Sequence, residues 1–296
     1  MRLSNVRVGD QNRVAIWEDG YRLVADEVDG RRLVDLDDLW AIWDGGPDMP
    51  GSLRHAFDEA RPVEEGALTL RASSLRPEKV LCIGRNYRAH AAETGSDVPT
   101  VPIVFNKFPS TLTASGATVP HPPATEQLDY EGELVVVMGR RAFNVRAADA
   151  LSYVAGYTVG NDLSARDLQN RTSQWLLGKS LPAFGPIGPV VVTRDELPDP
   201  AGLDLALYRN GERVQHASTD LMVFDVPTLI EYISHILPLR PGDVIFTGTP
   251  DGVILGKPVG ERRWLQPGDR LEVTIERIGT LVTLIGEPGL PAGEAL

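Results

Sequence analysis

Three carboxylates lie next to two apolar segments of the sequence. Glu131 and Glu133 lead into the segment 134–138, and Asp162 follows the segment 154–159. Residues i and i+2 of a strand point to the same face, so we expect the two glutamates to lie side by side. Two like charges beside an apolar strand are unfavourable unless a cation lies between them, and Mg²⁺, Mn²⁺ and Ca²⁺ prefer oxygen ligands. Three such ligands would leave about three octahedral positions for water or a chelating substrate.

Each of these acids also has an ordinary structural explanation. An isolated Glu-Gly-Glu at the edge of a strand is more often a solvated polar face. Asp162, taken alone, is more often a helix N-cap, because the residues after it have helical character. The metal site therefore depends on whether the two segments meet in the fold.

A histidine and a glutamate lie three residues apart in the segment 86–94. If this segment is helical, His90 and Glu93 share one face, and the carboxylate can hold the imidazole as a base that activates water. An exposed helical pair explains the same spacing equally well. The segment 94–97 contains a glycine and suits a mobile lid.

The elements that must position these groups are mostly strands. Apolar, β-branched runs predict core strands over 79–83, 101–106, 134–138, 154–159, 190–193, 244–247, 270–276 and 281–285. Asn210-Gly211, between 205–209 and 212–216, predicts a type I′ hairpin because both turn residues need a positive φ. Helical patterns cover 86–94, 163–174 and 227–237.

The first 74 residues predict a small β-rich module. Short alternating stretches are separated by Gly or Asp and lie at 13–17, 21–25 and 31–35. A weakly helical stretch over 53–60 follows, and 61–66 has the composition of a link. The larger domain then covers residues 75–296, and the whole is predicted to be a β-dominated α+β protein.

The composition narrows the classes of function. The chain has 296 residues and a net charge of -12, so its field repels nucleic acid. An acidic metabolite would need a local cation or a metal. The single cysteine, Cys82, excludes an intramolecular disulfide. The N-terminus lacks an apolar signal core and no run approaches the ~18 apolar residues of a membrane span, so we expect a cytoplasmic protein without membrane contact.

The ordered set of motifs resembles the fumarylacetoacetate hydrolase family, in its acylpyruvase and 2-oxo-acid branch. The resemblance begins near Pro77, extends to the C-terminus, and rests on Ile83-Gly84-Arg85-Asn86-Tyr87, 102–107, 129–134, 156–169, 178–180 and 247–250. It implies a mixed β-sandwich roll as the catalytic domain, a homodimer, and a site for Mg²⁺ or Mn²⁺ that Ca²⁺ can occupy in vitro.

The resemblance also implies roles for individual residues. Glu131, Glu133 and Asp162 match the metal ligands. His90 and Glu93 match a dyad on a segment that orders over the bound ligand.

Further matches concern the substrate and the lysine beside it. Lys179 matches the active-site lysine of the family, although an isolated lysine is normally solvated. The positions assigned to substrate binding are Arg85, Tyr87, Arg166, Gln169 and Thr249. Of these, Arg85 departs from the family pattern, because many relatives have an apolar residue there, and we expect it to add positive charge near the lid. Without the resemblance, Arg166 and Gln169 would be an exposed helix face and Thr249 a turn residue.

One segment departs from the family pattern. Many relatives have Phe-Asp-Thr/Gly-Phe where this chain has Leu181-Pro182-Ala183-Phe184. Two polar side chains are lost and proline fixes the local φ. We therefore expect no hydrogen bond from those two positions and a substrate preference that differs from the usual one.

The reaction expected from these residues is hydrolysis of a carbon–carbon bond in an acylpyruvate-like β-diketo acid. Glu93 would orient His90, His90 would take a proton from water, and Lys179 would stabilise the negative charge of the departing enolate. Decarboxylation of an oxaloacetate-type acid, and isomerisation or dehydration of a 2-hydroxymuconate-type acid, are the alternatives on the same site. A metabolite-binding protein without turnover is the alternative of a different class.

Overall fold

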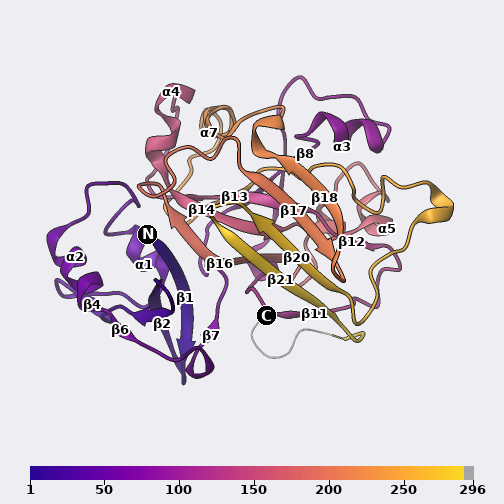
Figure 1. Cartoon of the computed structure of the whole chain (residues 1–296). Helices are drawn as coiled ribbons and strands as arrows, with labels where there is room; N and C mark the ends of the chain where they lie inside the picture. Colours follow the sequence, from indigo (N-terminus) through magenta and orange to yellow (C-terminus); the bar gives the residue numbers. More distant parts are fainter. Residues whose placement is uncertain (290–296) are drawn as a thin grey trace.

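Two β-sheets packed face to face form the framework of the protein (Figure 1). The computed structural model describes residues 1–289. The larger sheet has 12 strands and the smaller has five. The predicted fold class, α+β with strands dominant, is confirmed.

The larger sheet runs in the order β6 (Arg61–Pro62), β3 (Tyr21–Leu23), β2 (Gln11–Trp17), β1 (Arg2–Val8), β16 (Gly185–Thr193), β14 (Val154–Asn161), β13 (Gly132–Met138), β19 (Val244–Phe246), β8 (Val80–Gly84) and β9 (Ile103–Lys107). Beside this path, β7 (Thr69–Leu70) pairs with β1 and β10 (Leu112–Thr113) pairs with β16. The smaller sheet runs β11 (Thr118–Pro120), β21 (Gly279–Gly286), β20 (Arg270–Ile275), β17 (Asp204–Arg209) and β18 (Glu212–Ser218). Two short pairs join β12 (Leu128–Asp129) to β15 (Ser164–Ala165) and β4 (Glu27–Val28) to β5 (Arg31–Arg32).

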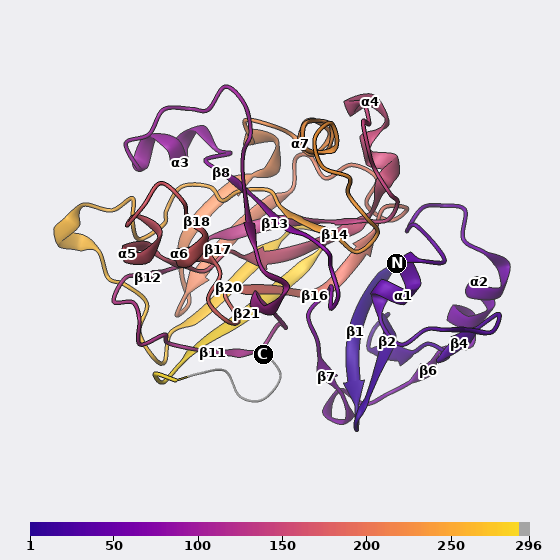
Figure 2. The same ribbon diagram turned by 180° about the vertical axis from the view of Figure 1, so that it is seen from behind.

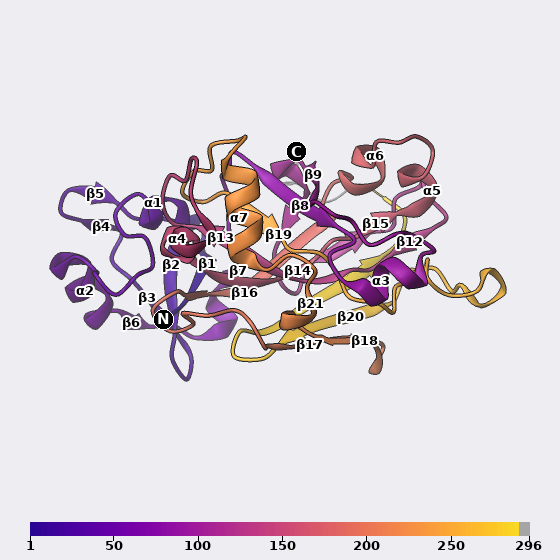
Figure 3. The same ribbon diagram turned by 90° about the horizontal axis from the view of Figure 1, so that it is seen from above.

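The helices are short and lie around the sheets. They are α1 (Leu36–Trp40), α2 (Gly51–Asp58), α3 (Arg88–Glu93), α4 (Ala147–Ala150), α5 (Arg166–Gln169), α6 (Leu176–Lys179) and α7 (Val226–Ser234). Helices α1 and α2 lie at one end of the molecule, and α5 and α6 lie at the other (Figures 2 and 3). Within residues 1–289, no helix has the length and apolar character needed to cross a membrane.

The N-terminal strands continue the larger sheet. Strand β1 pairs with β16, with Leu3 opposite Val191, and its other edge pairs with β2. The alternating stretches of the sequence did not include β1, because Ser4 and Asn5 interrupt its apolar pattern although both are buried. The amide of Asn5 donates to the carbonyl of Ala72 at 2.9 Å, a partner that the sequence does not reveal. The domain boundary at residue 74 remains a prediction.

Both faces of the larger sheet are covered, as strand β13 shows. Leu134 and Val136 belong to the core between the two sheets. Val135 and Val137 belong to a second core, which contains Trp40 of α1 and Phe57 of α2. A strand buried on both faces is apolar at successive positions, which is why the segment 134–138 carries no alternation.

One helix prediction was wrong. Of the segment 163–174, residues Ser164–Ala165 form β15 and only Arg166–Gln169 form α5. The N-cap of α5 is Ala165, so Asp162 does not cap it. Strand β15 pairs with β12, and this long-range pairing overrides the helical preference of the local sequence.

The predicted hairpin is confirmed. Strands β17 and β18 flank Asn210 and Gly211, whose φ angles are 53° and 84°. Both values lie in the left-handed region that a type I′ turn requires.

We expect the substitution Gly156→Ala to destabilise the fold. A Cβ atom at Gly156 would lie 2.3 Å from the carbonyl oxygen of Val192, so β14 and β16 would have to separate. Overpacking of this kind costs about 1–3 kcal/mol of unfolding free energy. Urea unfolding should show a lower midpoint with an unchanged slope.

The matched control is Gly260→Ala, because a Cβ there would meet nothing within 4 Å. Its unfolding free energy should stay within about 0.5 kcal/mol of the wild type. Equal midpoints for the two variants would contradict the close approach at Gly156.

Candidate active site

The structure brings the three predicted carboxylates together. Strands β13 and β14 are antiparallel, with Gly132 opposite Asn161, so the start of one meets the end of the other. Glu131, Glu133 and Asp162 are buried there, with one oxygen of each within 4.8 Å of the others. The solvated strand face that would otherwise explain the glutamates is excluded.

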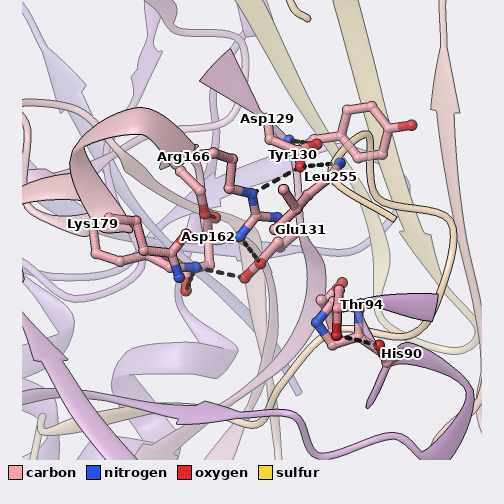
Figure 4. Close-up of polar contacts among 12 residues, drawn as sticks. His90, Thr94, Asp129, Tyr130, Glu131, Asp162, Arg166, Lys179 and Leu255 are labelled. Carbon is pink, nitrogen blue, oxygen red and sulfur yellow. Dashed lines mark hydrogen bonds and ion pairs between the residues drawn. The ribbon is translucent and has the colours of Figure 1, made fainter. Parts of the chain in front are cut away.

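Two cations hold Glu131, one at each carboxylate oxygen (Figure 4). Lys179 Nζ lies 2.7 Å from Glu131 Oε2 and 2.7 Å from Asp162 Oδ2. Arg166 Nη1 lies 2.8 Å from Glu131 Oε1, and its Nε lies 2.9 Å from Asp129 Oδ2. Both cations are buried, so neither the solvated lysine nor the exposed helix face describes them.

A third buried cation, Lys107, contacts Asp162 in this cluster. Its Nζ donates to Asp162 Oδ1, to the carbonyl of Leu163 at 3.2 Å, and to the carbonyl of Lys179. Strand β9 ends at Lys107, and α6 ends at Lys179. Lys107 therefore fixes the backbone of Lys179 as well as one of the predicted metal ligands.

The pKa values of the two glutamates are shifted in opposite directions. Burial opposes the ionisation of Glu131, but Lys179 and Arg166 outweigh it and hold the pKa of Glu131 below its ordinary value. Burial, followed by the charges of Asp162 and Glu131, raises the pKa of Glu133 well above its ordinary value. Lys179 stays protonated because Asp162 and Glu131 outweigh its burial and raise its pKa.

This donor set fits a divalent cation. Glu133 accepts one hydrogen bond from the N–H of Gly248 at 2.8 Å and forms no ion pair with any residue from 1 to 289. A hard cation bound by Glu131, Glu133 and Asp162 would supply the positive charge that Glu133 lacks. The buried acidic triad is therefore consistent with divalent metal binding.

The predicted dyad is formed. His90 and Glu93 lie on α3, and His90 Nδ1 is 2.8 Å from Glu93 Oε1. Glu93 Oε2 accepts the N–H of Gly252 at 2.9 Å, which attaches α3 to the loop after β19. An imidazole that donates Nδ1–H to a carboxylate keeps Nε2 free to accept a proton.

One cavity of about 300 Å³ contains most of the predicted site. The predicted residues that line it are Arg85, His90, Glu93, Glu131, Arg166, Gln169, Lys179 and Thr249. Glu133 and Asp162 lie behind this wall and are 1% and 0% exposed.

Tyr87 is not brought to the cavity. Its ring is buried and its hydroxyl has no hydrogen-bond partner in the part of the chain that the structure describes. Its backbone pairs with Met222, and its buried side chain has a packing role.

The segment 181–184, which differs from the family pattern, also lies outside the cavity. Ala183 and Phe184 are buried in the core between the two sheets, and Ala183 has a φ of 62°. None of the four residues lines the cavity. An influence of this segment on the substrate would therefore be indirect.

Three residues of the site were missed. Lys107 and Trp175 carried no assignment, although lysine is scarce in the chain. Asp129 accepts from Arg166 Nε and from the N–H groups of Ile254 and Leu255, at 2.9 and 3.0 Å. Asp129 continues the i, i+2 series of Glu131 and Glu133, which was the signal available for it.

Comparisons of the sequence and of the fold with known proteins point to the same family. Residues 79–285 match the family model described as fumarylacetoacetate hydrolase, C-terminal. The oxaloacetate tautomerase YisK of Bacillus subtilis is 43% identical, over 83% of this chain and 80% of that protein. A crystal structure of a putative HpcE protein from Mycobacterium smegmatis has a TM-score of 0.85 and 39% identity, and covers 98% of this chain and 100% of that one.

A third relative was solved with ligands. The fumarylpyruvate hydrolase from Pseudomonas aeruginosa, in complex with Mn²⁺ and pyruvate, has a TM-score of 0.65 and 31% identity. The match covers 79% of this chain and 94% of that one.

We expect Mn²⁺ to stabilise the protein through Glu133. A ligand present at 100 times its Kd adds about 2.7 kcal/mol to the unfolding free energy, so Mn²⁺ should raise the Tm and EDTA should reverse the rise. Calorimetric titration of Glu133→Gln with Mn²⁺ should show a loss of affinity of about 10- to 100-fold or more. A loss of this size is known for residues that hydrogen-bond to a metal ligand, and loss of a ligand itself should cost no less.

The control for this titration is Glu212→Gln, because Glu212 is exposed on β18. It should bind Mn²⁺ like the wild type. An unchanged affinity in Glu133→Gln would remove Glu133 from the metal site.

Proposed function

Since the chain belongs to the fumarylacetoacetate hydrolase family of enzymes, we propose that it is a divalent-metal-dependent enzyme that interconverts the keto and enol forms of an oxaloacetate-type 2-oxo acid. The observation that carries this proposal is the placement of the His90–Glu93 pair and the Lys179 ammonium on the walls of one small cavity. Tautomerisation needs a group that takes a proton from carbon and a positive charge beside the oxygen. Both are present here.

His90 would move the proton. Its Nδ1 is held by Glu93, so Nε2 can take a proton from C3 of the keto form and return it in the reverse direction. Mg²⁺ or Mn²⁺ bound by Glu131, Glu133 and Asp162 would make that proton more acidic.

Lys179 would act at the oxygen. The residue is part of the cavity lining, and its ammonium is fixed by Glu131 and Asp162, each at 2.7 Å. A charge fixed before the reaction stabilises negative charge that develops on the 2-oxo oxygen without reorganisation. The proton lost from C3 ends on that oxygen in the enol, so the two forms have the same atoms.

The oxaloacetate tautomerase with 43% identity supports tautomerisation above hydrolysis. Hydrolysis of an acylpyruvate-like acid remains the second candidate, because the 2.8 Å contact between His90 and Glu93 also suits activation of water. The hydrolase solved with Mn²⁺ and pyruvate supports that candidate. Decarboxylation of oxaloacetate would use the same groups. The homodimer and the cytoplasmic location remain predictions.

We expect His90→Asn to slow the tautomerisation of oxaloacetate. Loss of a general base typically lowers kcat about 10²- to 10⁴-fold. The ultraviolet absorbance of the enol follows the reaction after keto or enol oxaloacetate is mixed with the Mn²⁺-loaded protein. The control is His216→Asn, since His216 is exposed and contacts Asp204, which does not line the cavity. Full activity in His90→Asn would remove the dyad from the mechanism.

Product analysis separates the candidates. With acetylpyruvate as the substrate, ¹H NMR should show that acetate and pyruvate form no faster than they do without protein. Formation of both products, lost in Glu131→Ala, would establish the hydrolase instead. Release of pyruvate and CO₂ from oxaloacetate would indicate the decarboxylase. Stabilisation by oxaloacetate without any product or tautomer exchange would indicate a binding protein.

A further inference from the structure

Two cations and two aromatic rings line one side of the cavity. The guanidinium carbon of Arg85 lies 5.7 Å from the centroid of the Trp175 ring. Trp175 contacts Phe105 edge to face, with the ring centroids 5.3 Å apart. Lys179 Nζ lies 5.3 Å from the centroid of Phe105. The aromatic pair therefore separates the charge of Arg85 from the charge of Lys179.

Arg85 differs from Arg166 and Lys179 because no carboxylate among residues 1–289 pairs with its charge, which contacts only the Trp175 ring. Arg166 and Lys179 each contact two carboxylates. Arg85 is half-buried in the cavity wall and makes neither a hydrogen bond nor an ion pair with any residue up to 289, in a chain with 41 acidic residues. A guanidinium matches a carboxylate with two parallel hydrogen bonds, so this group is suited to an anion that enters from outside.

The backbone conformation at the end of β8 positions the Arg85 guanidinium beside the Trp175 ring. Arg85 has a φ of 56°, in the left-handed region that residues with a side chain seldom adopt. The preceding residue is Gly84, and a Cβ there would lie 2.5 Å from the Trp175 ring. Glycine thus allows the ring to approach, and the ring in turn supports Arg85. Unusual backbone conformations of this kind are concentrated at ligand sites.

Helix α6 links the two ends of the cavity wall. Trp175 is its N-cap and Lys179 is its last residue, four positions later. Side chains at this spacing lie on the same face of a helix. The ring under Arg85 and the ammonium between Glu131 and Asp162 are therefore held by one short rigid element.

We propose that Arg85, supported by Trp175, binds the second carboxylate of a 2-oxo dicarboxylate whose 2-oxo acid end lies at Lys179 and the acidic triad. Arg85 is then the residue that selects a dicarboxylate above a 2-oxo acid with a neutral tail. This inference rests on the proposed function for the orientation of the substrate. Arg262 also lines the cavity, but its Nε donates to the carbonyl of Lys257 at 3.0 Å.

The test measures binding apart from turnover. Calorimetry with the Mn²⁺-loaded protein compares oxaloacetate with oxalate, which mimics the 2-oxo acid end and has no tail. Arg85→Gln should bind oxaloacetate about 10- to 100-fold more weakly, the usual effect of losing one charge-assisted hydrogen-bonded pair, and should bind oxalate like the wild type. Arg85→Lys should recover part of the affinity for oxaloacetate. Arg171→Gln, an exposed arginine between α5 and α6, should change neither.

The outcomes separate this inference from the proposed function. A selective loss in Arg85→Gln supports the inference even if the wild type shows no tautomerisation. Equal affinities of Arg85→Gln and the wild type for oxaloacetate overturn it, even if the wild type is an active tautomerase. An equal loss for oxaloacetate and oxalate also overturns it, because the change then acts on the acidic triad. A selective loss in Arg262→Gln with none in Arg85→Gln assigns the carboxylate to Arg262 and overturns it too.

Discussion

The burial of negative charge at the junction of β13 and β14 is the constraint on which the site depends. Four carboxylates, Asp129, Glu131, Glu133 and Asp162, are buried there, and three cations face them, Lys107, Arg166 and Lys179. Charges removed from water are stable only when they are paired and hydrogen-bonded. The position of β9, α5 and α6 around this junction follows from the need to deliver those cations. Within residues 1–289, Glu133 is the carboxylate that no side-chain cation contacts, and this arrangement is consistent with binding of a divalent metal ion.

The layers on the two faces of the larger sheet remove most of this cluster from water. The smaller sheet covers one face, and the N-terminal segment with α1 and α2 covers the other. In such surroundings each ion pair is stronger than at the surface, and each unpaired charge costs more. The N-terminal segment lies far from α5 and α6, at the opposite end of the molecule (Figure 3). Its contribution to the chemistry is therefore the protection of the sheet that carries the ligands.

The sequence was informative where a residue's role depends on its neighbours in the chain. The period of two in β13 placed Glu131 beside Glu133, and the spacing of three placed His90 beside Glu93. The position of Asp162 after a second apolar segment indicated a third ligand, although the residue taken alone is typical of a helix cap. The resemblance to known proteins supplied Lys179, which local pattern alone assigned to a solvated surface. Lys107 and Trp175 were missed because their roles come from contacts made across the fold, with the carbonyl of Lys179 and with Arg85. The helix expected over 163–174 failed for the same reason, since the pairing of β15 with β12 is non-local.

The joining of β1 to β16 has a consequence for how the chain is made. The amino group of Met1 contacts Thr193, 192 residues later, and the two strands pair along their edges. Strand β7 pairs with Val6 and Arg7 on the second edge of β1, but Arg2 and Leu3 on that edge wait for β16, one of the last strands of the larger sheet. Until then the start of β1 presents an open edge, the kind of surface from which newly made chains associate wrongly. Completion of the N-terminal segment is thus tied to completion of the catalytic sheet, and a chain truncated before β16 keeps that edge exposed.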